Sequence, residues 1–143
     1  MLIRKVEERD IDDVVEIEND SFSSPYPREI FLDYLSSDYF LLSEDDDEIT
    51  GYILAEKRYG HGVIVSLAVK SERRLEGIGT SLMESVMDKM EAKRYFLIVR
   101  KSNTEARLFY PTLGFSEVTS VDNYYSNGED GILMQKKRAE ENN

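Results

Sequence analysis

The sequence predicts a mixed α/β domain in which helices cover both faces of one central sheet. Segments with strand-like and helical apolar spacing follow one another in the order β-α-α-β-β-β-α-β-α-β-β. Residues 62–69 (GVIVSLAV) are apolar almost throughout, as expected for a central strand that is covered on both faces. The length of 143 residues fits one core, which we expect over 1–137, with a frayed tail at 138–143.

The chain begins with a strand and two helices. Residues 2–6 (LIRKV) predict the strand. A helix follows within 9–22 with Asp10 as its N-cap, because four residues recur at helical spacing: Ile11, Val14, Val15 and Glu18. Pro25 and Pro27 break this pattern before a second helix resumes and runs to residue 35.

Three strands come next. Residues 39–43 and 49–59 predict a hairpin, and the acidic run EDDDE between them suits a solvated turn. The apolar run 62–69 then predicts the central strand.

The remaining elements alternate. Residues 80–91 predict a helix whose methionine-rich face suits core packing, and 94–100 predict a strand. A helix at 103–114 is bounded by an Asn103 N-cap and a Gly114 C-cap, and Pro111 limits its regular part. Two closing strands are expected at 115–121 and 131–137.

The composition excludes several classes of protein. There is no cysteine, which excludes disulfides and thiolate metal sites, and the single histidine argues against a histidine-based metal site, so we expect no metal. No apolar stretch approaches the roughly 20 residues that span a bilayer, and the N-terminus has no signal-peptide core. We therefore expect a cytoplasmic protein with no membrane partner.

The charge is strongly acidic and uneven. The net charge of −11 argues against nucleic-acid binding. Residues 1–56 carry seventeen acidic and four basic residues, whereas the rest carries twelve and fourteen. The acidic part would attract amines or basic peptides, although a solvated surface that maintains solubility explains most of these charges equally well.

One stretch of this acidic chain gathers arginine and glycine. Residues 72–80 (ERRLEGIGT) contain the pattern Arg74-x-x-Gly77-x-Gly79, placed where the central strand ends and a helix begins. A helix N-terminus has unpaired N–H groups and about half a positive charge, so it binds phosphate, and glycine lets the backbone approach closely. The stretch therefore predicts a site for an anionic cofactor.

Two other phosphate motifs do not fit. A P-loop requires Gly-Lys-Ser/Thr, and GIGTSLM contains no lysine. A dinucleotide fingerprint requires a third small residue where this chain has Leu82. A glycine-rich turn with its arginines in solvent is the remaining alternative.

The same pattern, R-x-x-G-x-G at a strand-to-helix turn, resembles the acetyl-CoA signature of the GNAT acetyltransferases. Four further segments, in the expected order, resemble N-terminal protein acetyltransferases of the archaeal and eukaryotic NatA catalytic type and the bacterial RimI-like alanine acetyltransferases: HGVIVSLAVK, IVRKSN, FYPTLGF and NYYSNGED. The resemblance spans nearly the whole chain and implies the GNAT fold, with acetyl-CoA as the acetyl donor.

The resemblance implies which residues bind acetyl-CoA. The backbone of Leu67, Ala68 and Val69 would accept the pantetheine arm in the manner of an added strand. The pyrophosphate would be held by Arg74 and the amides of Leu75, Glu76, Gly77, Ile78, Gly79 and Thr80. Asn103 would contact the cofactor further along, a role that can coexist with helix capping.

Tyr110 matches the family's general acid. An amine attacks the thioester, and the tetrahedral intermediate expels CoA as a thiolate. A phenol can donate a hydrogen bond or a proton to that sulfur, and a thiol with a pKa of about 8.5 needs little help to leave. Taken alone, a tyrosine in an amphipathic helix would more often be a core residue.

Four aromatic residues match substrate-contacting positions. Tyr125, with Tyr124 beside it, lies in the loop before the last strand. Phe22 and Tyr26 lie in SFSSPYP (21–27), which resembles the loop that lines the peptide entrance. Phe22 and Tyr26 would serve equally well as hydrophobic anchors of that loop.

The sequence departs from the family where relatives often carry the general base. Ile98 and Val63 occupy positions that hold Glu or His in many relatives. Glu29 and His61 are substitute bases, although each is typical of a solvated surface residue. A peptide α-amine with a pKa near 8 is already about a tenth neutral at pH 7, whereas lysine is neutral less than roughly one part in a thousand, so a weak base favours α-amine substrates.

These observations predict an enzyme that transfers acetyl from acetyl-CoA directly to protein or peptide N-termini within a ternary complex. Two alternatives stay open: a catalytically weak acyl-CoA-binding regulatory module, and an enzyme for a small amine such as a polyamine. The sequence leaves undetermined the preferred first residue, the oligomeric state and whether a ribosome-associated auxiliary subunit binds.

Overall fold

The computed structural model describes residues 1–138. Its strands are β1 (Leu2–Lys5), β2 (Phe40–Asp45), β3 (Glu48–Arg58), β4 (His61–Val69), β5 (Arg94–Arg100), β6 (Ser116–Val121) and β7 (Gly131–Lys137). Its helices are α1 (Ile11–Ser21), α2 (Arg28–Asp33), α3 (Ile78–Met90) and α4 (Thr104–Phe109), with 3-10 turns at Glu8–Asp10, Ser71–Arg73 and Tyr110–Leu113. The predicted element order is confirmed.

The strands form a mixed sheet in the order β1-β2-β3-β4-β5-β7-β6. Antiparallel pairing joins β1 to β2, β2 to β3, β5 to β7 and β6 to β7. The pairing of β4 with β5 is parallel and joins Gly62 to Tyr95 and Val63 to Phe96. Because parallel neighbours need a long crossover, α3 lies between these two strands in the sequence.

The backbone divides into two compact units. The first contains Met1–Glu56 and Ile64–Glu91, and the second contains Lys57–Val63 and the chain from Ala92 onward. The single domain expected over 1–137 stays a prediction. Of the tail expected to fray, Arg138 donates its backbone N–H to Lys93 O at 3.0 Å, and residues 139–143 lie outside the described residues.

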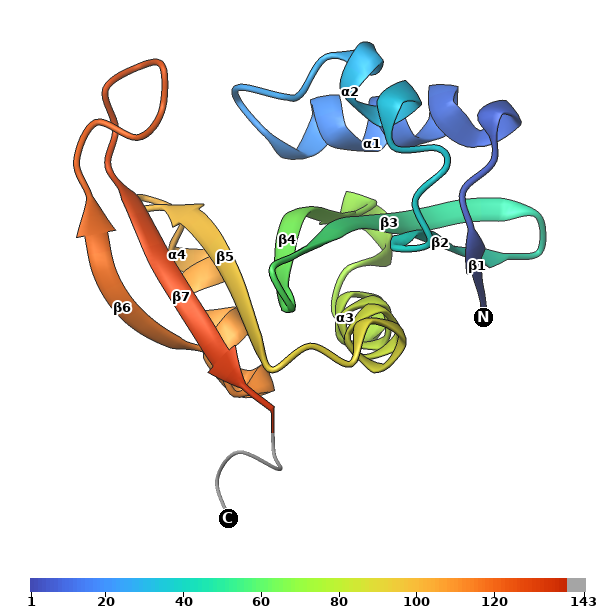
Figure 1. Cartoon of the computed structure of the whole chain (residues 1–143). Coiled ribbons are helices and arrows are strands. Elements are labelled where there is room, and N and C mark those ends of the chain that lie inside the picture. The colour runs from blue at the N-terminus through green and yellow to red at the C-terminus, as the bar shows by residue number, and fades with distance from the viewer. Residues whose placement is uncertain (139–143) are drawn as a thin grey trace. The chain divides into compact units, whose positions relative to one another are not determined.

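In the first unit, α1 and α2 lie over one face of the sheet and α3 lies on the opposite face (Figure 1). The α1–α2 side has an aromatic centre, where Tyr52 of β3 contacts Phe31 and Phe40 edge-on at 5.7 and 6.5 Å. On the other side, α3 buries the methionine-rich face expected from its sequence: Ile78, Leu82, Met83, Val86, Met87 and Met90. Helices therefore cover both faces here, as predicted.

The second unit is built on β5, β7 and β6, with α4 following β5 (Figure 1). Residues of β5 alternate between buried and half-buried, and Tyr95, Leu97 and Val99 are on the buried side. The helix expected at 103–114 ends at Phe109 and continues as a 3-10 turn through Leu113, because Pro111 has no N–H to donate. Gly114 terminates it with φ 96°, as expected of a C-cap glycine.

Asp10 precedes α1 as predicted, but its side chain does not cap that helix. Its carboxylate instead accepts the Glu7 backbone N–H at 2.8 Å and both terminal nitrogens of Arg4, at 2.8 and 2.9 Å. Arg4 also bonds Glu44 of β2 through its Nε at 3.0 Å. Asp10 therefore joins the first strand to the start of the helix through a partly buried ion pair.

Candidate active site

The turn between β4 and α3 has the backbone of an anion site. Gly77 precedes the helix with φ 80°, and Leu75 has φ 67° with its side chain fully exposed. The 13-residue helix then begins at Ile78 with no acidic residue in its first turn. Its unpaired N–H groups and positive end therefore face an open turn, the arrangement that favours phosphate.

The two neighbouring arginines of this turn have different surroundings. Arg73 binds three carboxylates, those of Asp45 at 2.7 Å, Glu48 at 3.0 Å and Glu76 at 3.1 Å. These contacts tie the turn to the β2–β3 hairpin. Arg74 is exposed, and its Nε donates to Val69 O at 3.4 Å.

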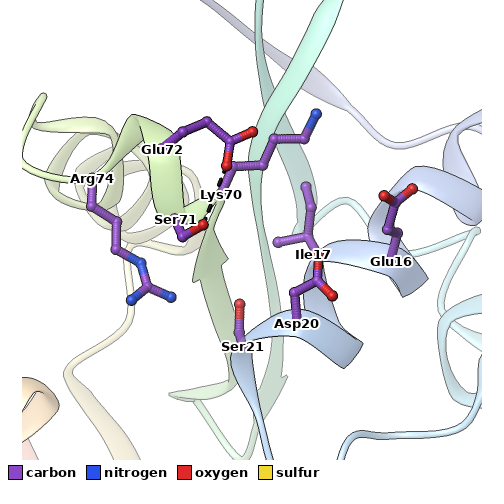
Figure 2. A pocket seen from close by; sticks show the side chains of 8 residues that line it. All are labelled: Glu16, Ile17, Asp20, Ser21, Lys70, Ser71, Glu72 and Arg74. Atoms are coloured by element: carbon purple, nitrogen blue, oxygen red, sulfur yellow. Dashed lines mark hydrogen bonds between the residues drawn. The ribbon is translucent and has the colours of Figure 1, made fainter.

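A polar hollow adjoins Arg74 (Figure 2). Its lining comes from the end of α1 and from the residues after β4: Glu16, Ile17, Asp20, Ser21, Lys70, Ser71, Glu72 and Arg74. Ser71 Oγ donates to Glu72 at 3.2 Å on its rim. The hollow thus brings the guanidinium of Arg74 beside polar groups of α1.

The end of β4 that carries Leu67, Ala68 and Val69 lies tightly against β3. A Cβ atom added at Gly51 would lie 2.9 Å from Ala68 O and 3.3 Å from a methyl of Val69. Ala68 is buried, whereas Leu67 and Val69 are half-buried on the opposite face. Glycine at position 51 therefore permits the close approach of these two strands.

In the second unit, Tyr110 is buried, with 8% of its surface exposed. Its ring contacts Phe109 at 5.1 Å and Phe115 at 5.8 Å. Burial, followed by the effect of nearby Tyr125, raises the pKa of Tyr110 well above its ordinary value. The phenol therefore keeps its proton at neutral pH and is a hydrogen-bond donor.

Asn103 caps α4 as the sequence predicts. Its side-chain oxygen accepts the Ala106 N–H at 3.0 Å. This bond uses one acceptor position of the amide group, so the side-chain nitrogen keeps its capacity to donate. The contact between Asn103 and the cofactor stays a prediction.

The loop that carries Tyr124 and Tyr125 is held by an ion pair. The Arg100 guanidinium lies 4.0 Å from the centre of the Tyr125 ring and donates to Glu129 at 3.0 Å. Glu129 also accepts the Ser102 N–H at 2.8 Å, and hydrogen bonding from Ser102, together with Arg100, keeps the pKa of Glu129 below its usual range. Tyr124 packs over Gly131, where an added Cβ would meet its side chain at 3.2 Å.

The loop between α1 and α2 is also held in place. Phe22 is half-buried and packs against the core of the first unit, which supports its role as an anchor. Tyr26 is 41% exposed, and its backbone N–H donates to Glu18 Oε2 at 2.9 Å. The two aromatic residues expected at the peptide entrance therefore differ: one is packed inward and one is presented at the surface.

The positions discussed for a general base are apolar or peripheral. Ile98 lies close to Gly131, where an added Cβ would come within 2.7 Å of its methyl group. Glu29 is exposed in the first turn of α2. His61 packs edge-on against Phe96 at 5.5 Å, and its Nδ1 is buried without a hydrogen-bond partner among the described residues. The identity of a base stays open.

Sequence reasoning missed several polar residues that organise these loops: Glu18, Tyr52, Ser66, Arg100 and Glu129. A signal existed for Glu18, which occupies the apolar face of its helix beside Ile11 and Val14. The sequence held no such signal for Tyr52 and Ser66, because both residue types are common in strands. Within each unit the predicted residues gather as follows: Leu67 through Thr80 surround the turn in the first, and Tyr110 lies near Tyr125 in the second.

The fold, together with the turn between β4 and α3, is typical of a known class of enzyme. The chain belongs to the Acetyltransferase (GNAT) family, which it matches over residues 11–115. It is therefore an acetyltransferase, and the fold predicted from the sequence is confirmed.

Individual relatives agree with this assignment. The chain is 40% identical to an uncharacterized N-acetyltransferase of Methanocaldococcus jannaschii, over 96% of this chain and 92% of that one. It is 34% identical to an N-alpha-acetyltransferase of Sulfurisphaera tokodaii (92% and 90% covered) and 32% identical to a putative [ribosomal protein bS18]-alanine N-acetyltransferase of Bacillus subtilis (92% of each). The crystal structure of Ard1 from Thermoplasma volcanium superimposes with a TM-score of 0.90 at 26% identity, covering 95% of this chain and 96% of that one.

None of the helices in residues 1–138 has the length and the apolar character that crossing a bilayer requires. The same part of the chain contains no group of three or more His, Cys, Asp or Glu side chains placed to hold a metal ion.

Proposed function

We propose that this acetyltransferase transfers the acetyl group of acetyl-CoA to the N-terminal α-amine of proteins or peptides. The observation that carries the donor half of this proposal is the turn after β4. It combines positive φ at Leu75 and Gly77, an uncapped helix N-terminus and Arg74 beside a polar hollow. These groups suit the pyrophosphate of a CoA thioester.

The acceptor half rests on two observations. The relatives described above include proteins named N-alpha-acetyltransferase and alanine N-acetyltransferase. In addition, Ile98 and Val63 provide no titratable group where a base is common. An α-amine with a pKa near 8 reacts without a strong base, whereas lysine at about 10.4 does not.

The proposed reaction proceeds by direct attack within a ternary complex. The neutral amine nitrogen attacks the thioester carbonyl carbon, forming the new C–N bond. The carbon–sulfur bond then breaks and CoA leaves as a thiolate that accepts a hydrogen bond from the Tyr110 phenol, while the amine loses its own proton to solvent or a base. The buried, protonated state of Tyr110 suits this donation.

The test measures CoA release with acetyl-CoA and matched peptides. The panel contains free N-termini beginning Ser, Ala, Met-Leu or Met-Glu, and one N-blocked peptide with an internal lysine. We expect release with peptides that have a free N-terminus only, and mass mapping should place the acetyl group on the α-amine.

The alternatives predict different results. A binding module would show no turnover while acetyl-CoA still raised the melting temperature. Turnover with spermidine but with none of the peptides would indicate a small-amine enzyme. Acetylation mainly at lysine would contradict the proposed acceptor. The cytoplasmic location and an auxiliary ribosomal subunit both stay predictions.

A further inference from the structure

Glu18 has a carboxyl group inside the core of the first unit. Its exposed fraction is 1%, whereas the other acidic residues of α1 are exposed: Asp12, Asp13, Glu16 and Asp20. Its neighbours on the same helix face, Val14 and Ile17, are apolar and buried. A carboxyl group in such surroundings is costly unless donors surround it, so its partners are informative.

Three donors converge on this carboxyl group. Oε1 accepts from the Tyr52 hydroxyl of β3 and from Ser66 Oγ of β4, the latter at 2.9 Å. The Tyr52 and Ser66 hydroxyls are themselves 2.9 Å apart. Burial, and then Glu18, raises the pKa of Tyr52 well above its ordinary value, so its phenol keeps its proton and donates. The sheet thus fixes Oε1 from two strands.

The third donor comes from a loop rather than from the sheet. Oε2 accepts the Tyr26 backbone N–H at 2.9 Å. Tyr26 stands between Pro25 and Pro27, which have no N–H, so it supplies the one backbone donor available at positions 25–27. Glu18 therefore holds the α1–α2 loop through this backbone donor.

The two flanking prolines make this attachment effective. Proline fixes its own φ and restricts the residue before it, so residues 24–27 have few accessible backbone conformations. One strong hydrogen bond at Tyr26 then sets the position of the whole short segment. The Tyr26 side chain, 41% exposed, leaves the loop from this fixed point.

We propose that Glu18 is a positioning residue that holds the loop 22–27 through the Tyr26 N–H, so that Tyr26 meets the first residue of the peptide substrate at a fixed place. The substrate part of this inference rests on the proposed function. Tyr52 and Ser66 bind the other oxygen of the same carboxyl group.

The test compares Glu18→Met with two kinds of control. Met keeps the approximate length of the side chain but has no oxygen, so it cannot accept the Tyr26 N–H. Asp13→Asn removes a carboxylate from the exposed side of the same helix. Tyr52→Phe removes a donor to Oε1 but leaves the bond from Tyr26 to Oε2 intact.

The first measurement is hydrogen exchange of the Tyr26 amide in the protein without substrates. We expect exchange about tenfold faster in Glu18→Met, as the loss of one buried hydrogen bond implies, and little change in Asp13→Asn and Tyr52→Phe. The second is steady-state kinetics. We expect Glu18→Met to raise KM for the peptide about tenfold and to leave KM for acetyl-CoA within about twofold.

Two results would overturn the inference. A Glu18→Met protein that melts earlier but keeps a slowly exchanging Tyr26 amide and its peptide KM would reduce Glu18 to a satisfied core residue. An equal rise in both KM values would show a general disturbance rather than positioning. If the wild-type enzyme acetylated no peptide, the proposed function would fail and the substrate part with it, while amide exchange would still decide whether Glu18 holds the loop.

Discussion

Tyr110 is the residue on which the proposed chemistry depends most directly. Its phenol is buried and protonated, which suits donation to a departing sulfur but also suits simple packing between Phe109 and Phe115. Replacement by Phe separates these roles, because the ring remains and only the hydroxyl is lost.

We expect Tyr110→Phe to lower kcat by roughly 10²-fold, the lower end for a general acid, since a thiol is already a good leaving group. The melting temperature and the stabilisation by acetyl-CoA should remain close to wild type. Tyr59→Phe, at a fully exposed tyrosine, is the matched control. An unchanged kcat in Tyr110→Phe would restrict Tyr110 to packing.

The ion pair of Asp10 predicts how the stability of the fold depends on pH. Hydrogen bonds from Arg4 hold its pKa below the ordinary value of about 3.9, against the opposing effect of burial. A depressed folded-state pKa means that the ion pair contributes stability at neutral pH, and that this contribution is lost as pH falls through the folded-state value.

We therefore expect Asp10→Asn to lower the free energy of unfolding by about 2 kcal/mol at pH 7, the scale of hydrogen bonds to a charged group. The difference from wild type should shrink steadily below about pH 4. Denaturant unfolding from pH 3 to pH 7 measures this, with exposed Asp13→Asn as the control. A difference that stayed constant with pH would contradict the ion-pair explanation.

At the scale of elements, two turns offer a matched pair of glycines. Gly77 and Gly60 have φ of 80° and 81°, and a Cβ at either would meet no heavy atom within 4 Å. An alanine at each position carries the same left-handed strain and no clash. They differ in place, since Gly77 precedes α3 and Gly60 lies in the β3–β4 turn.

We expect Gly77→Ala and Gly60→Ala each to lower stability by about 1 kcal/mol. Gly77→Ala alone should also weaken acetyl-CoA binding, because a relaxed backbone would no longer direct its N–H groups at the pyrophosphate. Calorimetric melting and titration with acetyl-CoA measure both effects. Equal loss of acetyl-CoA affinity in the two variants would contradict the assignment of this turn to the cofactor site.

The elements show where sequence reasoning succeeded. Apolar spacing predicted the β-strands and α-helices that residues 1–138 form, because burial of one face determines both the pattern and the element. The Asn103 cap and the Gly114 C-cap were also predicted, since each acts on its own few residues. The motif singled out Arg74, but sequence reasoning assigned no role to Arg73, because two of the three carboxylates that bind Arg73 come from the distant β2–β3 hairpin.

Asp10 and Glu18 show the limit of local rules. Asp10 lies at the N-cap position that the sequence predicts, yet its side chain accepts a bidentate hydrogen bond from Arg4 instead of capping the helix. Glu18 looked like one imperfect position on an apolar face, and its partners are 8, 34 and 48 residues away along the chain. Contacts between distant segments decide such roles, and one sequence without its fold does not reveal them.

At the scale of the whole molecule, the net charge of −11 works against compactness. Ion pairs such as those of Arg73 are partly exposed and contribute little individually. We expect sodium chloride raised from about 10 to 150 mM to increase the melting temperature, because screening at a Debye length near 8 Å relieves the general repulsion. A lower melting temperature at the higher salt concentration would mean that the ion pairs outweigh the general repulsion.

Leu75 has a consequence for proteolysis. A large apolar side chain that stands fully in solvent on a strained turn is a natural cleavage point for a protease specific for such residues, and Tyr59 in the β3–β4 turn is a second one. Fragments produced at the two places differ in mass and can be followed together. If acetyl-CoA lies on the turn after β4, it should slow cleavage beside Leu75 and leave cleavage beside Tyr59 unchanged. Cleavage beside Leu75 then reports occupancy of the turn, and cleavage beside Tyr59 is the internal reference.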